Sequence, residues 1–83
     1  LFVFFKMEIL KPKEVYRHYK EGKEYRIVDF ARDCGNPEKI NVIYMQLYPS
    51  KFSIGTLWSR SIEEFCEEVE IGGKKIKRFE LIE

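Results

Sequence analysis

A pair of glycines near the C-terminus, Gly72-Gly73, separates two short runs of alternating apolar and charged residues, EEVEI and KKIKRF. Glycine adopts positive φ easily, as a two-residue type I′ hairpin turn requires. Folding the chain about this turn places Val69 opposite Ile76 on one face and each glutamate opposite a lysine on the other, which stabilises paired strands. The sequence therefore predicts a tight β-hairpin over residues 68–77.

The alternation breaks beyond the hairpin. Ile76 and Phe79 are three positions apart, so they cannot share a face of a regular strand. A β-bulge near Lys77-Arg78 would restore the phase and bend the strand. Such a bend favours a curved sheet, as in a small barrel, over a flat one.

The rest of the chain consists mainly of short β-branched and aromatic runs separated by Gly, Pro, Asn and Asp. Strands are predicted over four further segments: residues 15–20, 24–32, 40–48 and 54–59. Residues 24–32 and 40–48 carry apolar side chains on both faces, so the latter is expected to be a central strand. Residues 33–38 are dense in turn formers and predict an exposed loop.

A helical signal occurs just before the hairpin. Ser61-Ile62-Glu63-Glu64 has the spacing of a capping box and predicts a short helix or 3₁₀ turn at residues 62–66. One helical turn and about five to six short antiparallel strands in 83 residues indicate a mainly β protein. The expected architecture is a small SH3-like barrel or half-barrel.

The first residues differ in character from the rest. Residues 1–6, LFVFFK, are expected to be an N-terminal extension or a short strand, and residues 7–83 a single small β domain. Five apolar residues are too few to cross a membrane, so no membrane contact and a cytoplasmic location are expected. An exposed apolar strand here would invite pairing with another chain.

Charge and cysteine content restrict the possible functions. Charged residues make up 35% of the chain, but the net charge is only +1, which disfavours binding to duplex nucleic acid. Cys34 and Cys66 are far apart and the chain has one histidine, so we expect no metal site, no cofactor and two reduced thiols. Cys34 is expected in a loop and Cys66 beside the helical turn.

The segment YRHYK contains the only histidine. In a strand, Tyr16, His18 and Lys20 share one face, whereas Arg17 and Tyr19 share the other. His18 is either a half-buried structural ring that donates a hydrogen bond or part of a polar and aromatic binding patch. The sequence leaves these two interpretations open.

Trp58 and Arg60 are two positions apart and project from one face of a strand. Such a pair can stack on a ring and bind a carboxylate or phosphate, although Trp58 can equally be a core residue and Arg60 the partner of a nearby glutamate. In a recognition face, Arg17 and Tyr19 should lie near Trp58 or Arg60. The candidate binding residues are Tyr16, Arg17, His18, Tyr19, Tyr48, Trp58 and Arg60.

An ordered set of residues resembles the small bacterial domain-of-unknown-function family numbered 1653, whose pattern runs YRHxKG, Y, LY, WxRP, F and a hairpin that ends in RF. The matching residues are Tyr16-Arg17-His18-Tyr19-Lys20, Gly22, Tyr25, Ala31, Tyr44, Leu47-Tyr48, Trp58, Arg60, Phe65, Val69 and Arg78-Phe79. The resemblance covers residues 14–82. It departs at Ser61 and Lys77, where the family has proline. It implies a compact, mostly β domain of bacterial or phage origin, without an established activity.

No catalytic constellation is evident, and we do not expect an enzyme. The sequence has no Gly-x-Ser-x-Gly motif and no glycine-rich phosphate loop. The first hypothesis is a non-catalytic binding module whose aromatic and basic face holds a peptide or single-stranded nucleic acid. The alternative is a structural or assembly protein that acts as a homodimer through an apolar face or sheet edge.

Overall fold

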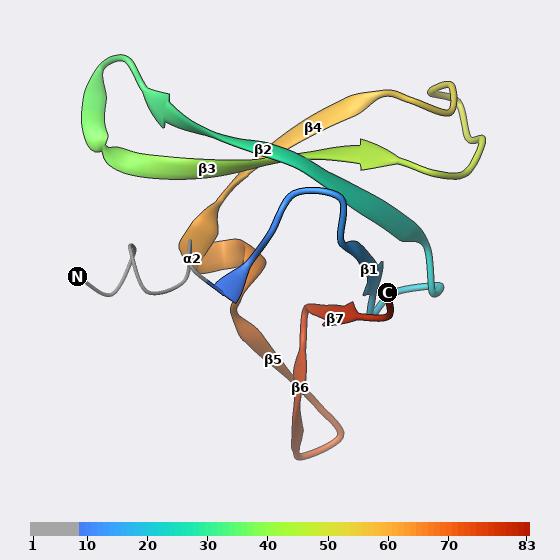
Figure 1. Ribbon diagram of the computed structural model, residues 1–83. Helices are drawn as coiled ribbons and strands as arrows, with labels where there is room; N and C mark the ends of the chain where they lie inside the picture. The colour runs from blue at the N-terminus through green and yellow to red at the C-terminus, as the bar shows by residue number, and fades with distance from the viewer. Residues whose placement is uncertain (1–8) are drawn as a thin grey trace.

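A computed structural model describes residues 9–83 of the chain (Figure 1). The expectations for residues 1–6 therefore lie outside the described residues. The elements in chain order are β1 (Val15–His18), β2 (Glu24–Asp33), β3 (Asn36–Gln46), β4 (Leu57–Ser61), α2 (Ile62–Phe65), β5 (Glu68–Ile71), β6 (Lys74–Lys77) and β7 (Phe79–Leu81).

Five strands form one antiparallel sheet in the order β4-β3-β2-β1-β7, and β5 and β6 form a separate two-stranded hairpin. The predicted mainly β class with one short helical turn is confirmed. Strands β4 and β7 are the two edges of the sheet, so the sheet is open and corresponds to the half-barrel alternative. The described residues contain seven strands because the chain bends at Arg78, which divides the last predicted strand into β6 and β7.

The predicted C-terminal hairpin is confirmed with its register. Val69 pairs with Ile76 and Glu70 with Lys75. Gly72 and Gly73 have φ values of 58° and 82°, as the turn requires. The β5–β6 hairpin, which we call the arm, extends away from the five-stranded sheet (Figure 1).

Strand β2 contains a bulge that the sequence analysis missed. Ile27 pairs with Tyr44 and Asp29 with Ile43, so Val28 is an extra residue between the two pairs. The bulge changes the phase of the strand, and Phe30 then pairs with the core residue Val42. Tyr25, Ile27 and Phe30 therefore follow one face on either side of the bulge, whereas Val28 and Ala31 are exposed.

Other boundaries also differ from the prediction. The loop expected over residues 33–38 is a turn at Cys34-Gly35, because Asn36 already pairs with Asp33 and begins β3. Strand β4 begins at Leu57 and not at residue 54. Strand β3 is paired on both sides, by β2 and β4, as expected of a central strand.

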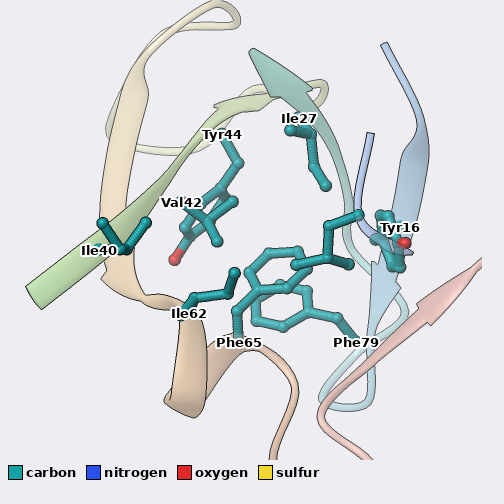
Figure 2. Close-up of a cluster of buried hydrophobic side chains, with 9 residues drawn as sticks. Tyr16, Ile27, Ile40, Val42, Tyr44, Ile62, Phe65 and Phe79 are labelled. Atoms are coloured by element: carbon teal, nitrogen blue, oxygen red, sulfur yellow. The ribbon is translucent and has the colours of Figure 1, made fainter. Parts of the chain in front are cut away.

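The core lies between the concave face of the sheet and α2 (Figure 2). The rings of Phe65 and Phe79 stack in parallel with a centroid distance of 4.1 Å. Helix α2 begins where predicted, since the Ser61 side chain accepts a hydrogen bond of 3.2 Å from the amide of Glu64. The core residues are Leu10, Tyr16, Ile27, Ile40, Val42, Tyr44, Ile62, Phe65 and Phe79.

One buried polar residue organises the connection between β3 and β4. Gln46 is 1% exposed, and its Nε2 donates to the carbonyl oxygens of Tyr48 and Phe52 at 2.7 and 2.9 Å. Its Oε1 accepts a hydrogen bond of 3.1 Å from Trp58 Nε1. This side chain therefore satisfies carbonyls of the loop that precedes β4 and fixes the position of the tryptophan.

The cysteines lie where the sequence placed them, Cys34 exposed in the β2–β3 turn and Cys66 half-buried directly after α2, and they are not joined to each other. Among residues 9–83, no helix has the length and hydropathy needed to cross a membrane.

Candidate functional site

Side chains from all five strands of the sheet line a hollow of about 170 Å³ at the end of β1. They come from β1, the β1–β2 turn, β2, β3, the segment after β3, β4 and β7. The lining residues are His18, Lys20, Glu21, Lys23, Tyr25, Tyr44, Tyr48, Arg60 and Phe79. We call it the donor-rich hollow because nitrogen and hydroxyl donors dominate its lining.

Arg60 is the cation that the fold fixes most closely in this hollow. Its Nε donates to the Tyr44 hydroxyl at 3.3 Å, and its Nη1 lies 3.5 Å from a carboxylate oxygen of Glu64. Its guanidinium carbon lies 5.8 Å from the centroid of the Phe79 ring. Guanidinium carries more N–H donors than these contacts use, so Arg60 has donors left for a ligand.

Three tyrosines form another part of the lining. The hydroxyls of Tyr25 and Tyr48 are hydrogen-bonded to each other, and the Tyr25 ring meets those of Tyr44 and Tyr48 edge to face. Burial raises the pKa of the Tyr25 hydroxyl, and the hydrogen bond with Tyr48 raises it further. The Tyr25 hydroxyl therefore stays neutral near pH 7. Lys23 Nζ lies 5.0 Å from the centroid of the Tyr48 ring.

His18 forms the boundary of the hollow. Its ring stacks on Tyr19 at 4.9 Å and meets Phe79 edge-on at 4.8 Å, and its Nδ1 accepts a 3.1 Å hydrogen bond from the Lys20 amide. Partial burial lowers the pKa of His18, and the positive charges of Arg60, Arg78 and Lys20 lower it further. The imidazole is therefore neutral near pH 7 with its proton on Nε2, which makes it another uncharged donor.

A second, larger hollow of about 540 Å³ is also lined by His18. It is located between the β1–β2 turn and the arm, and we call it the arm hollow. Its lining residues are Arg17, His18, Tyr19, Gly22, Ile76, Lys77 and Glu80.

The structure divides the residues predicted from the sequence. His18, Tyr48 and Arg60 meet in the donor-rich hollow, although they are distant in the sequence. Tyr16 is a core residue, 6% exposed, with its ring edge-on to Phe65. Trp58 is half-buried against the core and hydrogen-bonded to Gln46, as the core interpretation of this residue expected.

The expectation that Arg17 lies with Trp58 or Arg60 is wrong, whereas Tyr19, just past the end of β1, stacks on His18. Because side chains alternate along β1, Arg17 points away from the core face that holds Tyr16, and it forms an ion pair of 3.3 Å with Glu24. Trp58 and Arg60 lie on the core face, since they pair across the sheet with Tyr44 and Val42. Arg17 and Tyr19 line the arm hollow instead.

Sequence reasoning missed several lining residues of the donor-rich hollow. Lys23 and Tyr25 follow the β1–β2 turn, and Phe79 follows the bend at Arg78. The resemblance pattern included Tyr25, Tyr44 and Phe79, and most lining residues belong to that pattern. Grouping the residues of that pattern by the strand face they share could have identified Tyr25, Tyr44 and Phe79.

Within residues 9–83, no group of three or more His, Cys, Asp or Glu side chains is placed to hold a metal ion. His18 contacts a backbone amide and two aromatic rings. The arrangement can donate hydrogen bonds and present positive charge to a small group.

Comparisons with known proteins agree with this structure. The chain is similar over 92% of its length to a crystal structure from Bordetella bronchiseptica, with a TM-score of 0.76 and 29% identity, and covers 91% of that chain. That protein is described as belonging to DUF1653. No curated protein matches the chain. The profile of the family described as "Protein of unknown function (DUF1653)" matches residues 14–81. The chain therefore belongs to the DUF1653 family.

Proposed function

We propose that this domain is a non-catalytic binding module and that the donor-rich hollow holds an anionic group of its partner, which is a peptide or a single-stranded nucleic acid. The observation that carries this proposal is the surplus of donors in the hollow. Arg60, Lys20 and Lys23 supply positive charge, and Glu21 is the only carboxylate among the described residues of its lining. A ligand group that only accepts hydrogen bonds complements such a surface.

The size of the hollow suits a single anionic group and is too small for a whole cofactor. Pockets for small molecules of drug size usually measure roughly 300–1,000 Å³. The donor-rich hollow measures about 170 Å³. A carboxylate or phosphate fits this volume, with the rest of the partner lying outside it.

Titration of the ¹⁵N-labelled domain with sodium acetate and with sodium phosphate, followed by NMR, tests this proposal. We expect amide shifts at Lys20, Lys23 and Arg60, because these residues line the hollow. Arg60→Gln should weaken binding about tenfold, the effect of losing one charge-assisted hydrogen bond.

Arg26→Gln is the matched control, because Arg26 is exposed and pairs with Val15 and Met45 outside the hollow. It should bind both anions as the wild type does. Equal binding by wild type and Arg60→Gln, or equal losses in the two variants, would argue against the hollow as the anion site.

A homodimer is the second candidate that we propose, for a reason separate from the N-terminal residues. Strand β4 is an edge of the sheet; its first residue, Leu57, is 54% exposed, and Phe52 and Ile54 in the preceding loop are 43% and 60% exposed. Apolar side chains at an open strand edge favour pairing between chains. Sedimentation equilibrium of wild type and Leu57→Lys tests it: a wild-type dimer that the variant lacks supports this candidate, and a monomeric wild type excludes it.

A further inference from the structure

His18 lines both hollows. The donor-rich hollow is also lined by Lys20, Arg60 and three tyrosines. The arm hollow is also lined by Tyr19 and Ile76. A ligand that lies over His18 can therefore contact two hollows of different chemistry.

We infer that the two hollows form one bipartite site for an acidic peptide, whose carboxylate enters the donor-rich hollow while a neighbouring apolar side chain enters the arm hollow. This inference rests on the proposed function and deepens it, since it names the partner class and adds a second point of contact.

The arm hollow suits an apolar side chain with charge nearby. Ile76 is 39% exposed on the arm, and the ring of Tyr19 is half-buried beside it. Covering exposed apolar surface is favourable in proportion to its area. Arg17, which is paired with Glu24, and Lys77 also line it, and both side chains combine an aliphatic stem with a positive charge. These charges complement an acidic segment, with Glu80 as the one opposing carboxylate of this lining.

The aromatic surfaces favour a peptide over single-stranded nucleic acid. Bases bind by stacking on open ring faces. The Tyr19 ring is stacked on His18, with Lys20 Nζ 5.9 Å from its centroid, and Lys23 lies over Tyr48. Phe79 is 4% exposed. Side chains of the domain thus cover the faces of these rings, which leaves little open surface on which a base could stack. A carboxylate needs only hydrogen-bond donors.

The test uses the ¹⁵N-labelled full chain and blocked tetrapeptides with Leu next to Glu, in either order, between acetyl-Gly and Gly-amide. Matched peptides replace Glu by Gln or Leu by Ala, and a decathymidine oligonucleotide is the nucleic-acid probe. We expect one of the Leu and Glu peptides to shift amides in both hollows. Each peptide replacement should weaken its binding roughly tenfold, as expected for one pocket contact.

Two variants separate the contacts. Ile76→Ser should remove the preference for Leu over Ala and keep that for Glu over Gln, and its exposed position on the arm makes unfolding unexpected. Arg60→Gln should do the reverse.

The possible failures differ in meaning. If Glu is preferred over Gln but Leu and Ala peptides bind equally, the bipartite site is wrong and the proposed anion site stands. If acetate, phosphate and all peptides fail to bind, both proposals fall. Decathymidine that binds more tightly than every peptide, with shifts at the same amides, would replace the peptide by nucleic acid.

Discussion

Strands β6 and β7 are separated by one residue, Arg78, yet they lie in contrasting surroundings. Every residue of β6 is exposed, and within residues 9–83 its one partner strand is β5. Strand β7 joins the large sheet beside β1, and its first residue, Phe79, is 4% exposed. The arm therefore depends on its own turn and cross-strand pairs, whereas β7 depends on contacts with residues distant in the sequence.

Arg78 connects the two regions. Its backbone amide donates to the Glu67 carbonyl at 3.0 Å, and its Nη2 lies 2.6 Å from a Glu67 carboxylate oxygen. Its Nε donates to the Glu64 carbonyl at 3.1 Å, close to the C-terminal end of α2. These contacts hold the bend in place, so that Phe79 can leave the line of the arm and enter the core.

The largest difference between the two regions should appear on truncation of their apolar residues. Phe79→Ala removes a buried ring that stacks on Phe65 and supports His18, so we expect a loss of about 3–5 kcal/mol in unfolding free energy. Ile76→Ala, on the exposed arm, should cost about 0.5 kcal/mol or less. Urea denaturation measures both. Similar losses in the two variants would show that the arm is packed as tightly as the sheet.

The same comparison explains which parts of the fold could be predicted. The hairpin was predicted with its register because turn residues and charge pairs are local signals. The break between Ile76 and Phe79 was also visible. Ile27 and Phe30 have the same spacing, but Val28 between them is apolar and hid the bulge. A bulge occupied by an apolar residue looks, in the sequence alone, like a strand buried on both sides.

The next largest loss of stability is expected in the loop between β3 and β4. This loop relies on one buried side chain, Gln46, whereas the turn of the arm relies on its glycines. Gln46→Leu leaves the Trp58 indole N–H and loop carbonyls without their partner, so we expect a loss of about 1–3 kcal/mol. Ser50→Ala removes only one of the contacts of Gln46 and should cost less. Urea denaturation with tryptophan fluorescence measures both, and a neutral Gln46→Leu would argue against this role.

The candidate site was less predictable than the hairpin. Alternation along β1 correctly separated Tyr16 and His18 from Arg17. It could not show which face of β1 is on the same side of the sheet as Arg60 of β4, because that depends on the order in which the strands pair. The meeting of His18 with Arg60 and Phe79 is a result of this long-range order.

A smaller loss is expected at the arm turn itself. Gly73 has a φ of 82°, which a β-branched side chain adopts at a cost of about 1–2 kcal/mol. Gly73→Val should therefore lower the melting temperature, while Gly73→Asn, which tolerates positive φ better, should lower it less. Calorimetry compares the two. An unchanged melting temperature for Gly73→Val would contradict the turn, and a loss as large as that of Phe79→Ala would contradict the independence of the arm.

The smallest expected effect is a pH dependence of the unfolding free energy, which we expect from His18 in the donor-rich hollow and not from the arm. The folded protein lowers the pKa of His18 below its ordinary 6.5, so at pH values under 6.5 the unfolded chain binds more protons than the folded one. The unfolding free energy should therefore fall as the pH decreases from 7.5 to 5.5, a range above the ordinary pKa values of carboxylates. His18→Gln should flatten this decrease, whereas Ile76→Ala should keep the wild-type slope, because Ile76 does not titrate and lies on the arm.

Urea denaturation at pH 7.5, 6.5 and 5.5 measures the slopes. A wild-type slope that His18→Gln leaves unchanged would mean that another group titrates, and a rise in stability toward pH 5.5 would mean that the charged imidazole is favoured in the hollow.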